Sequence, residues 1–396
     1  MKHRDRIDAL VKDLAPELKD LTKKIHANPE IGMKEFKAYE WQVELLKKYG
    51  FDLEEGYCDM PTAYRATYRS DKSGPVLATI AEYDCLPKIG HGCGHNLIAM
   101  MGIGAGIVLK EFVDMYGGEI RVYGTPGEEN AGGKIPMADA GVFDDVDVCM
   151  EVHPACHYSD SWNMSAIDGF FIEFFGQPTH AANSPEKGVN ALDAMILLFQ
   201  AIGLLRQQTK EDARIHAIIL EGGTAVNVIP DYTKAEICTR SYRAADVHDL
   251  SDRVIKAAEG AALATGCTFK MTRPAPMWPD LVSNQTLTDR IAEYITEVVG
   301  EEPKRLHGKY KSGSTDLGSV SYRCPTTQPN VKIGDAPDGT IFGMHTPYFA
   351  EFAGSDEAID ASIEFIKVIV GTGIDALTEP EFLAKVKEEF ENMDKK

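Results

Sequence analysis

A short stretch of the chain, His91-Gly92-Cys93-Gly94-His95-Asn96, carries two imidazoles and a thiol. Thiolate and neutral imidazole are ligands that zinc and similar divalent metals prefer, and their close spacing lets one loop present several donors to one ion. We interpret the stretch as half of a metal site. The alternative interpretation is a glycine-rich turn with a buried cysteine and two capping histidines.

Further polar residues follow runs of apolar, strand-like sequence. Residues 76–83 lead into Asp84 and the Cys93/His95 loop, residues 119–123 precede Glu128 and Glu129, and residues 146–152 stop at His153. Strand, loop and helix alternate as in α/β proteins, in which ligands bind at the carboxyl ends of the strands. We therefore expect these side chains at one edge of one sheet.

The residue types indicate hydrolysis assisted by metal ions. The candidate ligands are Cys93, His95, Glu129, His153 and His345. Glu128 is not among these ligands. A glutamate near a metal-activated water can act as general base, accept a proton from the water and return it to a leaving amine. Asp84 could hydrogen-bond a ligand imidazole and fix its orientation. The implied reaction is cleavage of an amide.

Cys93 could instead be a nucleophile with a histidine partner. It is flanked by glycines, lies between histidines and lacks an oxyanion signature at a helix start, so metal ligation explains it better.

The elements that must position these residues form two groups. Helical periodicity covers much of residues 6–47, a helix-like run of small residues spans 97–112, and a strand is expected at 326–333. Between them, strands and helices alternate in the β-α-β-β-α-β order of a ferredoxin-like unit. We expect this unit to be a domain of residues 166–276, inserted into a domain made of 1–165 and 277–396.

Composition limits the function. A formal net charge of −20 over 396 residues leaves no basic stripe for a phosphate backbone, so we expect no nucleic-acid partner. No run of eighteen apolar residues predicts a membrane span, and the charged N-terminus does not resemble a signal peptide, so we expect no membrane partner and a cytoplasmic location. Eight cysteines without CxxC pairs indicate reduced thiols.

Six motifs, in order along nearly the whole chain, resemble the co-catalytic metallopeptidase family of aminoacylases, carboxypeptidase G and the auxin-conjugate amidohydrolases (peptidase family M20). The similarity is greatest to the sub-branch of aminobenzoyl-glutamate hydrolase and aminoacylase-1-like dipeptidases. The motifs are Asp84-Cys85-Leu86-Pro87, His91 to Asn96, Pro126-Gly127-Glu128-Glu129, His153-Pro154, Gly176-x-x-x-His180-Ala181 and Asn227-Val228-Ile229-Pro230.

The resemblance implies a mixed-sheet α/β catalytic domain with helices on both faces and an inserted α+β dimerisation domain. It also implies two divalent metal ions per subunit, manganese or zinc, with cobalt or nickel possible. Cys93, His95, Glu129, His153 and His345 would be the ligands, and Glu128 the base. The substrate would be an N-acyl or N-aroyl amino acid or a dipeptide.

The resemblance further implies that the protein is a homodimer or higher homo-oligomer. His180 would then enter the partner's active site and stabilise the oxyanion. Asn227 and Arg240 would hold the substrate carbonyl or carboxylate, and Gly313 and Ser314 belong to a glycine-rich loop on the substrate side. Arginine suits this role because its planar fork matches a carboxylate in two bonds.

The chain departs from the family pattern without losing a ligand. Asn96 stands where many members have Asp, and alanine is usual at Cys85, Gly92 and Gly127. Asn130-Ala131-Gly132-Gly133 replaces a glycine run. We therefore expect activity, with hydrolytic deamination of an aromatic amine, or drift to a binding role, as alternatives.

Overall fold

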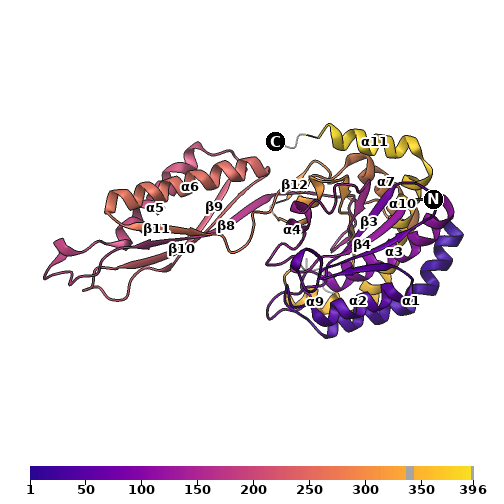
Figure 1. Ribbon diagram of the computed structural model, residues 1–396, viewed down its shortest axis with the longest axis horizontal. Helices are drawn as coiled ribbons and strands as arrows, with labels where there is room; N and C mark the ends of the chain where they lie inside the picture. Colours follow the sequence, from indigo (N-terminus) through magenta and orange to yellow (C-terminus); the bar gives the residue numbers. More distant parts are fainter. Residues whose placement is uncertain (312, 336–342, 394–396) are drawn as a thin grey trace. The chain divides into compact units, whose positions relative to one another are not determined.

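The computed structural model describes residues 1–311, 313–335 and 343–393, and the chain divides into two units (Figure 1). The first unit contains Met1–Asn163, Leu281–Lys311 and the chain from Asp316 onward. The second runs from Met164 to Asp280, with the short segment Gly313–Thr315. Each unit has its own cluster of buried apolar side chains.

A six-stranded mixed sheet lies at the centre of the first unit, in the order β1-β2-β4-β3-β5-β13. Its strands are β1 (Asp52–Glu55), β2 (Tyr64–Arg69), β3 (Val76–Ala81), β4 (Glu119–Gly124), β5 (Val148–Met150) and β13 (Thr326–Thr327). From β4 to β13 neighbouring strands are parallel, whereas β1 and β2 are antiparallel. Two further pairs are β6 (His153–Ala155) with β14 (Asn330–Lys332), and β7 (Asn163–Met164) with β12 (Tyr310–Lys311).

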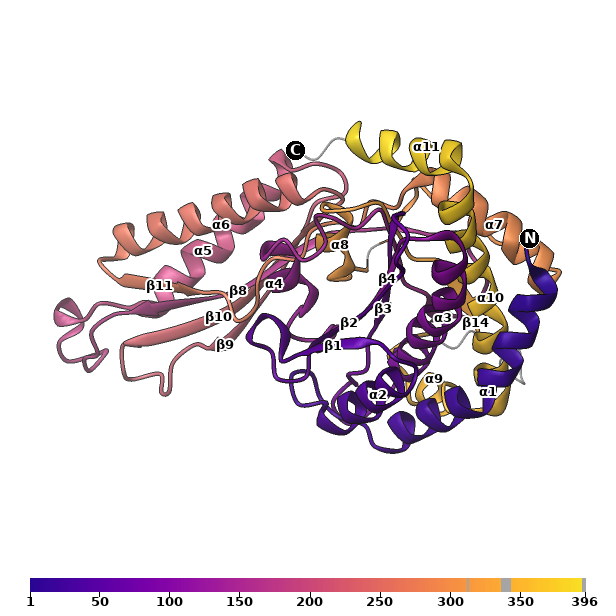
Figure 2. The ribbon, with the colours of Figure 1, turned by 45° about the vertical axis from the view of Figure 1, so that its right-hand side comes forward.

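The helices of the first unit pack around this sheet. They are α1 (Arg4–Ala27), α2 (Phe36–Lys48), α3 (His95–Tyr116), α4 (Lys134–Asp139), α7 (Gln285–Val299), α8 (Leu317–Ser321), α9 (Pro347–Phe352), α10 (Asp356–Thr378) and α11 (Pro380–Glu391), with a 3₁₀ turn η1 (Tyr57–Asp59). α3 packs against β3 and β4, and α1 and α10 pack against α3. In both ribbon views α4 lies on the other side of β3 and β4 from α3 (Figures 1 and 2).

Helix α3 positions the end of the predicted metal loop. It begins at His95, two residues before the expected start, because Gly94 adopts a left-handed conformation (φ 80°) directly before it. The helix is long and apolar enough to span a membrane, but 89% of its most apolar stretch is buried within the protein. A Cβ at Gly102 would lie 2.2 Å from the Ile80 carbonyl oxygen, so glycine lets α3 approach β3 closely. α3 is therefore a core helix of this unit.

The structure corrects two strand boundaries. The expected strand 146–152 is limited to β5, and His153 opens β6, which pairs with β14 in a separate sheet. The expected strand 326–333 divides into β13 and β14. The chain thus passes from one sheet to the other just before His153, so this histidine does not lie in the same strand as β5.

The second unit has the β-α-β-β-α-β order expected from the sequence. Its elements are β8 (Ala166–Phe175), α5 (Ala191–Leu205), β9 (Arg214–Glu221), β10 (Tyr232–Ser241), α6 (Ala244–Thr265) and β11 (Thr268–Thr272), with 3₁₀ turns η2 (Pro185–Lys187) and η3 (Arg206–Gln208). The sheet is antiparallel, in the order β11-β8-β10-β9. Fully buried and partly buried residues alternate in β8, and α5 and α6 cover the sheet together (Figure 1).

A buried glutamate ties the N-terminal helices to the loop after β4. Glu35, directly before α2, is fully buried, and its carboxylate accepts hydrogen bonds from the Thr62 hydroxyl and from the Gly127 backbone N–H, both at 2.9 Å. Burial, followed by the negative charge of Asp84, raises the pKa of Glu35 from 4.5 to about 7. The loop that carries Glu128 is therefore anchored by a carboxyl that is costly to ionise.

This pKa predicts a pH-dependent stability. Between pH 4.5 and about 7 the folded chain keeps the Glu35 proton that the unfolded chain loses, so the free energy of unfolding falls as pH rises. The contribution is roughly 3 kcal/mol, because one pKa unit corresponds to about 1.4 kcal/mol. In chelator-treated protein, Glu35→Gln should gain this amount over wild type between pH 4.5 and pH 8, measured by denaturant unfolding.

Glu40→Gln is the matched control, because Glu40 lies exposed on α2, the helix that begins directly after Glu35. Its stability difference from wild type should not vary over this pH range. If the free energy of unfolding changed with pH in the same way in wild type and in Glu35→Gln, the prediction would be contradicted.

Candidate functional site

Asp84 orients two of the predicted ligands at once. It follows β3 and is fully buried. One carboxylate oxygen lies 2.8 Å from His95 Nδ1, and the other accepts the Glu129 backbone N–H at 3.0 Å. Because Nδ1 is engaged, His95 presents Nε2 to the opposite side, where this buried atom has no hydrogen-bond partner among the described residues. Asp84 thus has the geometry expected for an orienting group.

The electrostatics around His95 favour a positive charge. Its Nε2 lies 3.4 Å from Glu82 Oε2 and 3.9 Å from Glu128 Oε2. Burial alone would lower the pKa of the imidazolium, but the carboxylates of Asp84 and Glu82 outweigh burial and raise this pKa well above its ordinary value. The same carboxylates would stabilise a divalent cation at Nε2, since a cation there faces the same negative charges.

Cys93 and His153 form the next part of the cluster. The Cys93 sulfur lies 3.4 Å from His153 Nε2, and His153 Nδ1 lies 2.8 Å from the Pro154 carbonyl oxygen. Burial raises the pKa of the Cys93 thiol far above its ordinary value, so a thiolate at this position requires a cation beside it. The Nδ1 contact to a carbonyl directs Nε2 toward the thiol, the arrangement usual for a ligand histidine.

Glu129 and His345 complete the set. His345 Nε2 lies 3.5 Å from Glu129 Oε2, whereas Glu129 Oε1 is buried without a hydrogen-bond partner in the described part of the chain. His345 has a left-handed backbone (φ 66°), and its N–H donates to the Gly92 carbonyl at 2.8 Å. This backbone bond brings a residue distant in sequence next to the Cys93 loop.

The predicted ligands form overlapping groups, and within each group the ligand atoms all lie within 4.8 Å of one another. These groups are Cys93/His95/His153, Cys93/Glu129/His345 and His95/Glu128/Glu129. The structure therefore brings together all five predicted ligands and Glu128. The thiol, imidazole and carboxylate donors, together with His95 Nε2 and Glu129 Oε1, which have no hydrogen-bond partner among the described residues, fit divalent cations, and two of the groups share Cys93.

Sequence reasoning missed a buried charged group beside Glu128. Glu82, Glu128 and Asp316 each contribute an oxygen to a further group within 4.8 Å, and Lys134 contacts both Glu82 and Asp316. Burial, followed by the negative charges of Glu82 and Asp316, raises the pKa of Glu128 well above its ordinary value. Glu82 could have been suspected, because it lies two residues before Asp84 and alternate residues of an extended segment share a face. Lys134 carries no such sequence signal.

The remaining predicted site residues lie in the second unit. Arg240, on β10, donates to the Ser314 hydroxyl at 3.4 Å, and the Gly313 carbonyl accepts the Ser165 N–H at 2.9 Å. His180 forms a β-bridge with Val228, and the Ala181 N–H donates to the Asn227 carbonyl at 2.9 Å. The structure thus places Arg240 with Ser314, and His180 with Asn227. His180 and Asn227 are both exposed.

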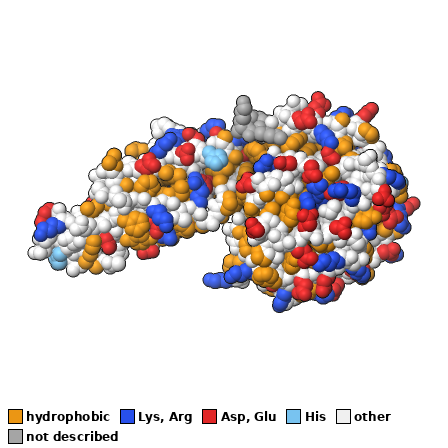
Figure 3. Space-filling model, in the orientation of Figure 1, with side chains coloured by type: hydrophobic (Ala, Val, Ile, Leu, Met, Phe, Trp, Pro, Cys, Tyr) orange, Lys and Arg blue, Asp and Glu red, His pale blue; other side chains and the backbone are white. Residues whose placement is uncertain are grey.

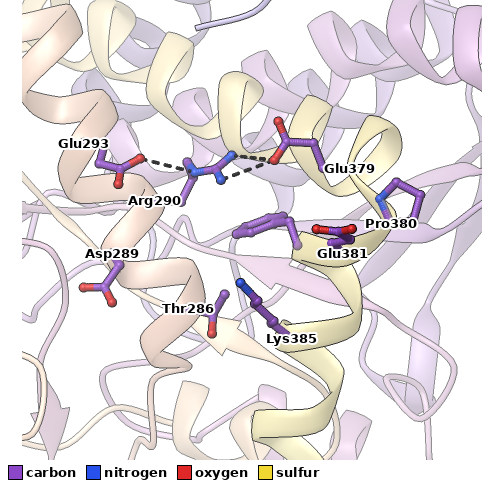
Figure 4. A pocket seen from close by; sticks show the side chains of 9 residues that line it. Thr286, Asp289, Arg290, Glu293, Glu379, Pro380, Glu381 and Lys385 are labelled. Atoms are coloured by element: carbon purple, nitrogen blue, oxygen red, sulfur yellow. Dashed lines mark hydrogen bonds and ion pairs between the residues drawn. The ribbon is translucent and has the colours of Figure 1, made fainter.

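A groove between α7 and α11 of the first unit offers no comparable chemistry (Figure 4). Its central cation, Arg290, is paired with Glu379 at 3.2 Å, Glu293 at 3.4 Å and Asp375. Arg290 also lies over the Phe382 ring. These contacts engage the guanidinium on several sides, so Arg290 holds α7 and the start of α11 together.

The chain is similar to known proteins over most of its length. The family model described as Peptidase family M20/M25/M40 matches residues 81–370. The Xaa-Arg dipeptidase of Mus musculus is 33% identical over 98% of this chain and 90% of its own length. A polypeptide of the p-aminobenzoyl-glutamate hydrolase of Escherichia coli is 35% identical over 63% of this chain and 56% of its own length.

Solved structures share the fold. An aminobenzoyl-glutamate utilization protein from Klebsiella pneumoniae superposes with a TM-score of 0.73 at 20% identity, covering 92% of this chain and 98% of that chain. A dinuclear metal-binding peptidase of the M20 family from Bacillus subtilis superposes with a TM-score of 0.63 at 19% identity. The superposition covers 90% of this chain and 99% of that chain. Because the family model matches most of this chain, the chain belongs to peptidase family M20/M25/M40 and is a hydrolase acting on C–N bonds.

Proposed function

We propose that this protein is a metal-dependent amidohydrolase that cleaves the amide bond of a dipeptide or an N-acyl amino acid. The observation that carries the proposal is the cluster of five donors around the buried, unpartnered His95 Nε2 and Glu129 Oε1, with Glu128 beside it. The names of the related dipeptidase and aminobenzoyl-glutamate hydrolase support the substrate class. When bound, two divalent ions supply the Lewis acidity that makes water a nucleophile near neutral pH.

The protein's own residues perform the remaining steps. Asp84 holds His95 and the Glu129 backbone in place. Glu128, which cations at the adjacent donors would hold in its ionised form, accepts the proton of the attacking water and returns it to the leaving amine as the C–N bond breaks. Arg240, with Ser314 beside it, binds the substrate carboxylate, because its guanidinium can form two parallel hydrogen bonds. Asn227 binds the substrate carbonyl.

We also propose that the second unit mediates dimerisation and that His180 acts in the partner's site by donating a hydrogen bond to the oxyanion. Strand β9 lies at an end of its sheet and carries Ile218, Ile219 and Leu220, which are 43–56% exposed. Figure 3 shows apolar side chains on the visible surface of this unit. An edge strand with exposed apolar residues suits pairing with a second copy, which would cover them.

Metal removal and loss of Glu128 should have separable effects. Chelator-treated protein should not release amino acids from a panel of dipeptides ending in Arg or Lys, N-acyl amino acids and aminobenzoyl-glutamate, followed by mass spectrometry. Manganese or zinc should restore release. Glu128→Gln should still bind two ions per chain but lose on the order of 10²–10⁴-fold in kcat, the usual contribution of a general base.

The surface variant Glu40→Gln should behave as wild type in this assay. Hydrolysis that survives complete metal removal, or a Glu128→Gln variant with undiminished kcat, would refute the proposed chemistry.

Action of His180 in the partner's site predicts complementation. Glu128→Ala and His180→Ala should each be inactive, but equal amounts mixed under conditions of subunit exchange should regain about a quarter of wild-type activity, because half of the dimers are hybrids with one complete site. Mixing Glu128→Ala with a Glu128→Ala/His180→Ala double variant cannot form a complete site and is the control. No recovery despite demonstrated exchange would show that His180 does not act in trans.

A further inference from the structure

Lys134 is a lysine enclosed by carboxylates in the interior of the first unit. Its side chain has no exposed surface, and its ammonium bonds to Glu82 Oε1 and, at 2.6 Å, to Asp316 Oδ1, with Glu151 Oε2 at 3.8 Å. Burial alone would lower the pKa of this ammonium, but Asp316 and Glu82 outweigh burial and raise it well above its ordinary value. Lys134 is therefore a fixed internal positive charge.

The partners of Lys134 come from separate parts of the chain. Glu82 follows β3, Glu151 follows β5, Asp316 precedes α8, and Lys134 is the first residue of α4. Asp316 is bound twice, since its second oxygen accepts the Lys134 backbone N–H at 2.9 Å. One residue thus links the ends of two central strands to the starts of two helices.

The loop that carries Glu128 closes directly onto Lys134. The N–H groups of Ala131 and Gly132 both donate to the Gly127 carbonyl at 2.9 Å, which folds the loop back on itself. Gly132 is left-handed (φ 66°), and a Cβ at Gly133 would lie 2.1 Å from the Pro126 carbonyl oxygen. These glycines permit the tight return that brings Lys134 close to the carboxylates around Glu128.

Glu128 lies between two sets of groups. One of its oxygens lies within 4.8 Å of ligand atoms of His95 and Glu129, and one belongs to the group formed with Glu82 and Asp316. Three carboxylates so close repel one another, and at short range in a poorly solvated interior this repulsion is large. Lys134 neutralises and clamps two of the three, and within the described chain no hydrogen bond or ion pair joins it to a predicted metal ligand.

We propose that Lys134 is a positioning residue for the hydrolytic reaction. By holding Glu82 and Asp316 together, it keeps Glu128 at the place from which it exchanges a proton with the attacking water. This inference rests on the proposed role of Glu128 as base. Without the ammonium, the carboxylates separate and the loop carrying Glu128 shifts, although the metal ligands keep their own anchors at Asp84 and Gly92.

The test is Lys134→Met, which keeps most of the side-chain length and removes the charge. In metal-loaded protein, kcat should fall on the order of 100-fold, the cost of a misplacement of about 1 Å, with KM within a few-fold of wild type and two ions per chain retained. Lys134→Met/Asp316→Asn removes one negative charge with the positive one and should recover at least part of the lost kcat. Lys110→Met removes a half-buried lysine that donates to a backbone carbonyl, and it should keep wild-type kcat.

Hydrogen exchange provides a second measurement that needs no substrate. Peptides covering residues 125–133 should exchange faster in metal-loaded Lys134→Met than in wild type, and more slowly again in the double variant. If wild type hydrolyses nothing in the substrate panel, the proposed function fails, while the exchange data still decide whether Lys134 holds the loop.

A wild-type kcat in Lys134→Met would overturn the proposal, as would a loss of activity that is fully explained by lost metal. If Lys134→Met does not fold, the single variant Asp316→Asn tests the positioning role of Lys134 instead. It weakens the clamp but leaves Lys134 paired with Glu82, so kcat should fall without a matching change in KM and exchange in the loop should rise. Unchanged kcat and exchange in Asp316→Asn would then overturn the proposal.

Discussion

Burial of like charges is the constraint on which the site depends. Five carboxylates are buried around His95 and Lys134, those of Glu82, Asp84, Glu128, Glu151 and Asp316. Charges removed from water are tolerated only when opposite charges or hydrogen bonds compensate them. Lys134 supplies one positive charge. In the proposed function, His95 would bind a cation as a neutral ligand, and that cation would supply further positive charge. Burial and neighbouring carboxylates raise the pKa of Glu128 and of Glu151, and a divalent cation at the adjacent donors would favour the ionised forms instead.

The part of the site that follows the central strands could be predicted from the sequence. Apolar runs identified β3, β4 and the position of β5, and parallel neighbours must bring their carboxyl ends together. This reasoning placed Asp84, Glu128 and Glu129 at one edge. It could not place His345, whose approach depends on one backbone bond to Gly92. Nor could it find Lys134, whose partners Glu82 and Asp316 are 52 and 182 residues away, because a lone lysine in a sequence is typical of solvent-exposed surface.

The departure at Asn96 has a structural explanation. The side-chain amide of Asn96 donates to Thr22 Oγ1 at 3.0 Å and to the Ala353 backbone carbonyl at 2.9 Å. The Thr22 hydroxyl in turn donates to the backbone carbonyl of Asn96. An aspartate carboxylate has no N–H to donate and would place its charge against the Ala353 carbonyl. Asparagine thus joins α1, α3 and the end of α9, the helix that follows His345, and it does so without adding to the buried negative charge.

The glycine departures also concern the backbone and leave the donors unchanged. Gly127 has φ 70°, which an alanine would adopt only with strain, and a Cβ at Gly92 would lie 2.8 Å from Ile89 Cγ2. Both glycines flank predicted ligands or the base, yet neither contributes a side chain. These two differences from the family pattern therefore concern how the loops pack, whereas the donors of the proposed metal site are all present. If the proposed site is correct, differences in substrate should arise at Arg240 and Ser314, where the substrate carboxylate is expected, and not among the proposed metal ligands.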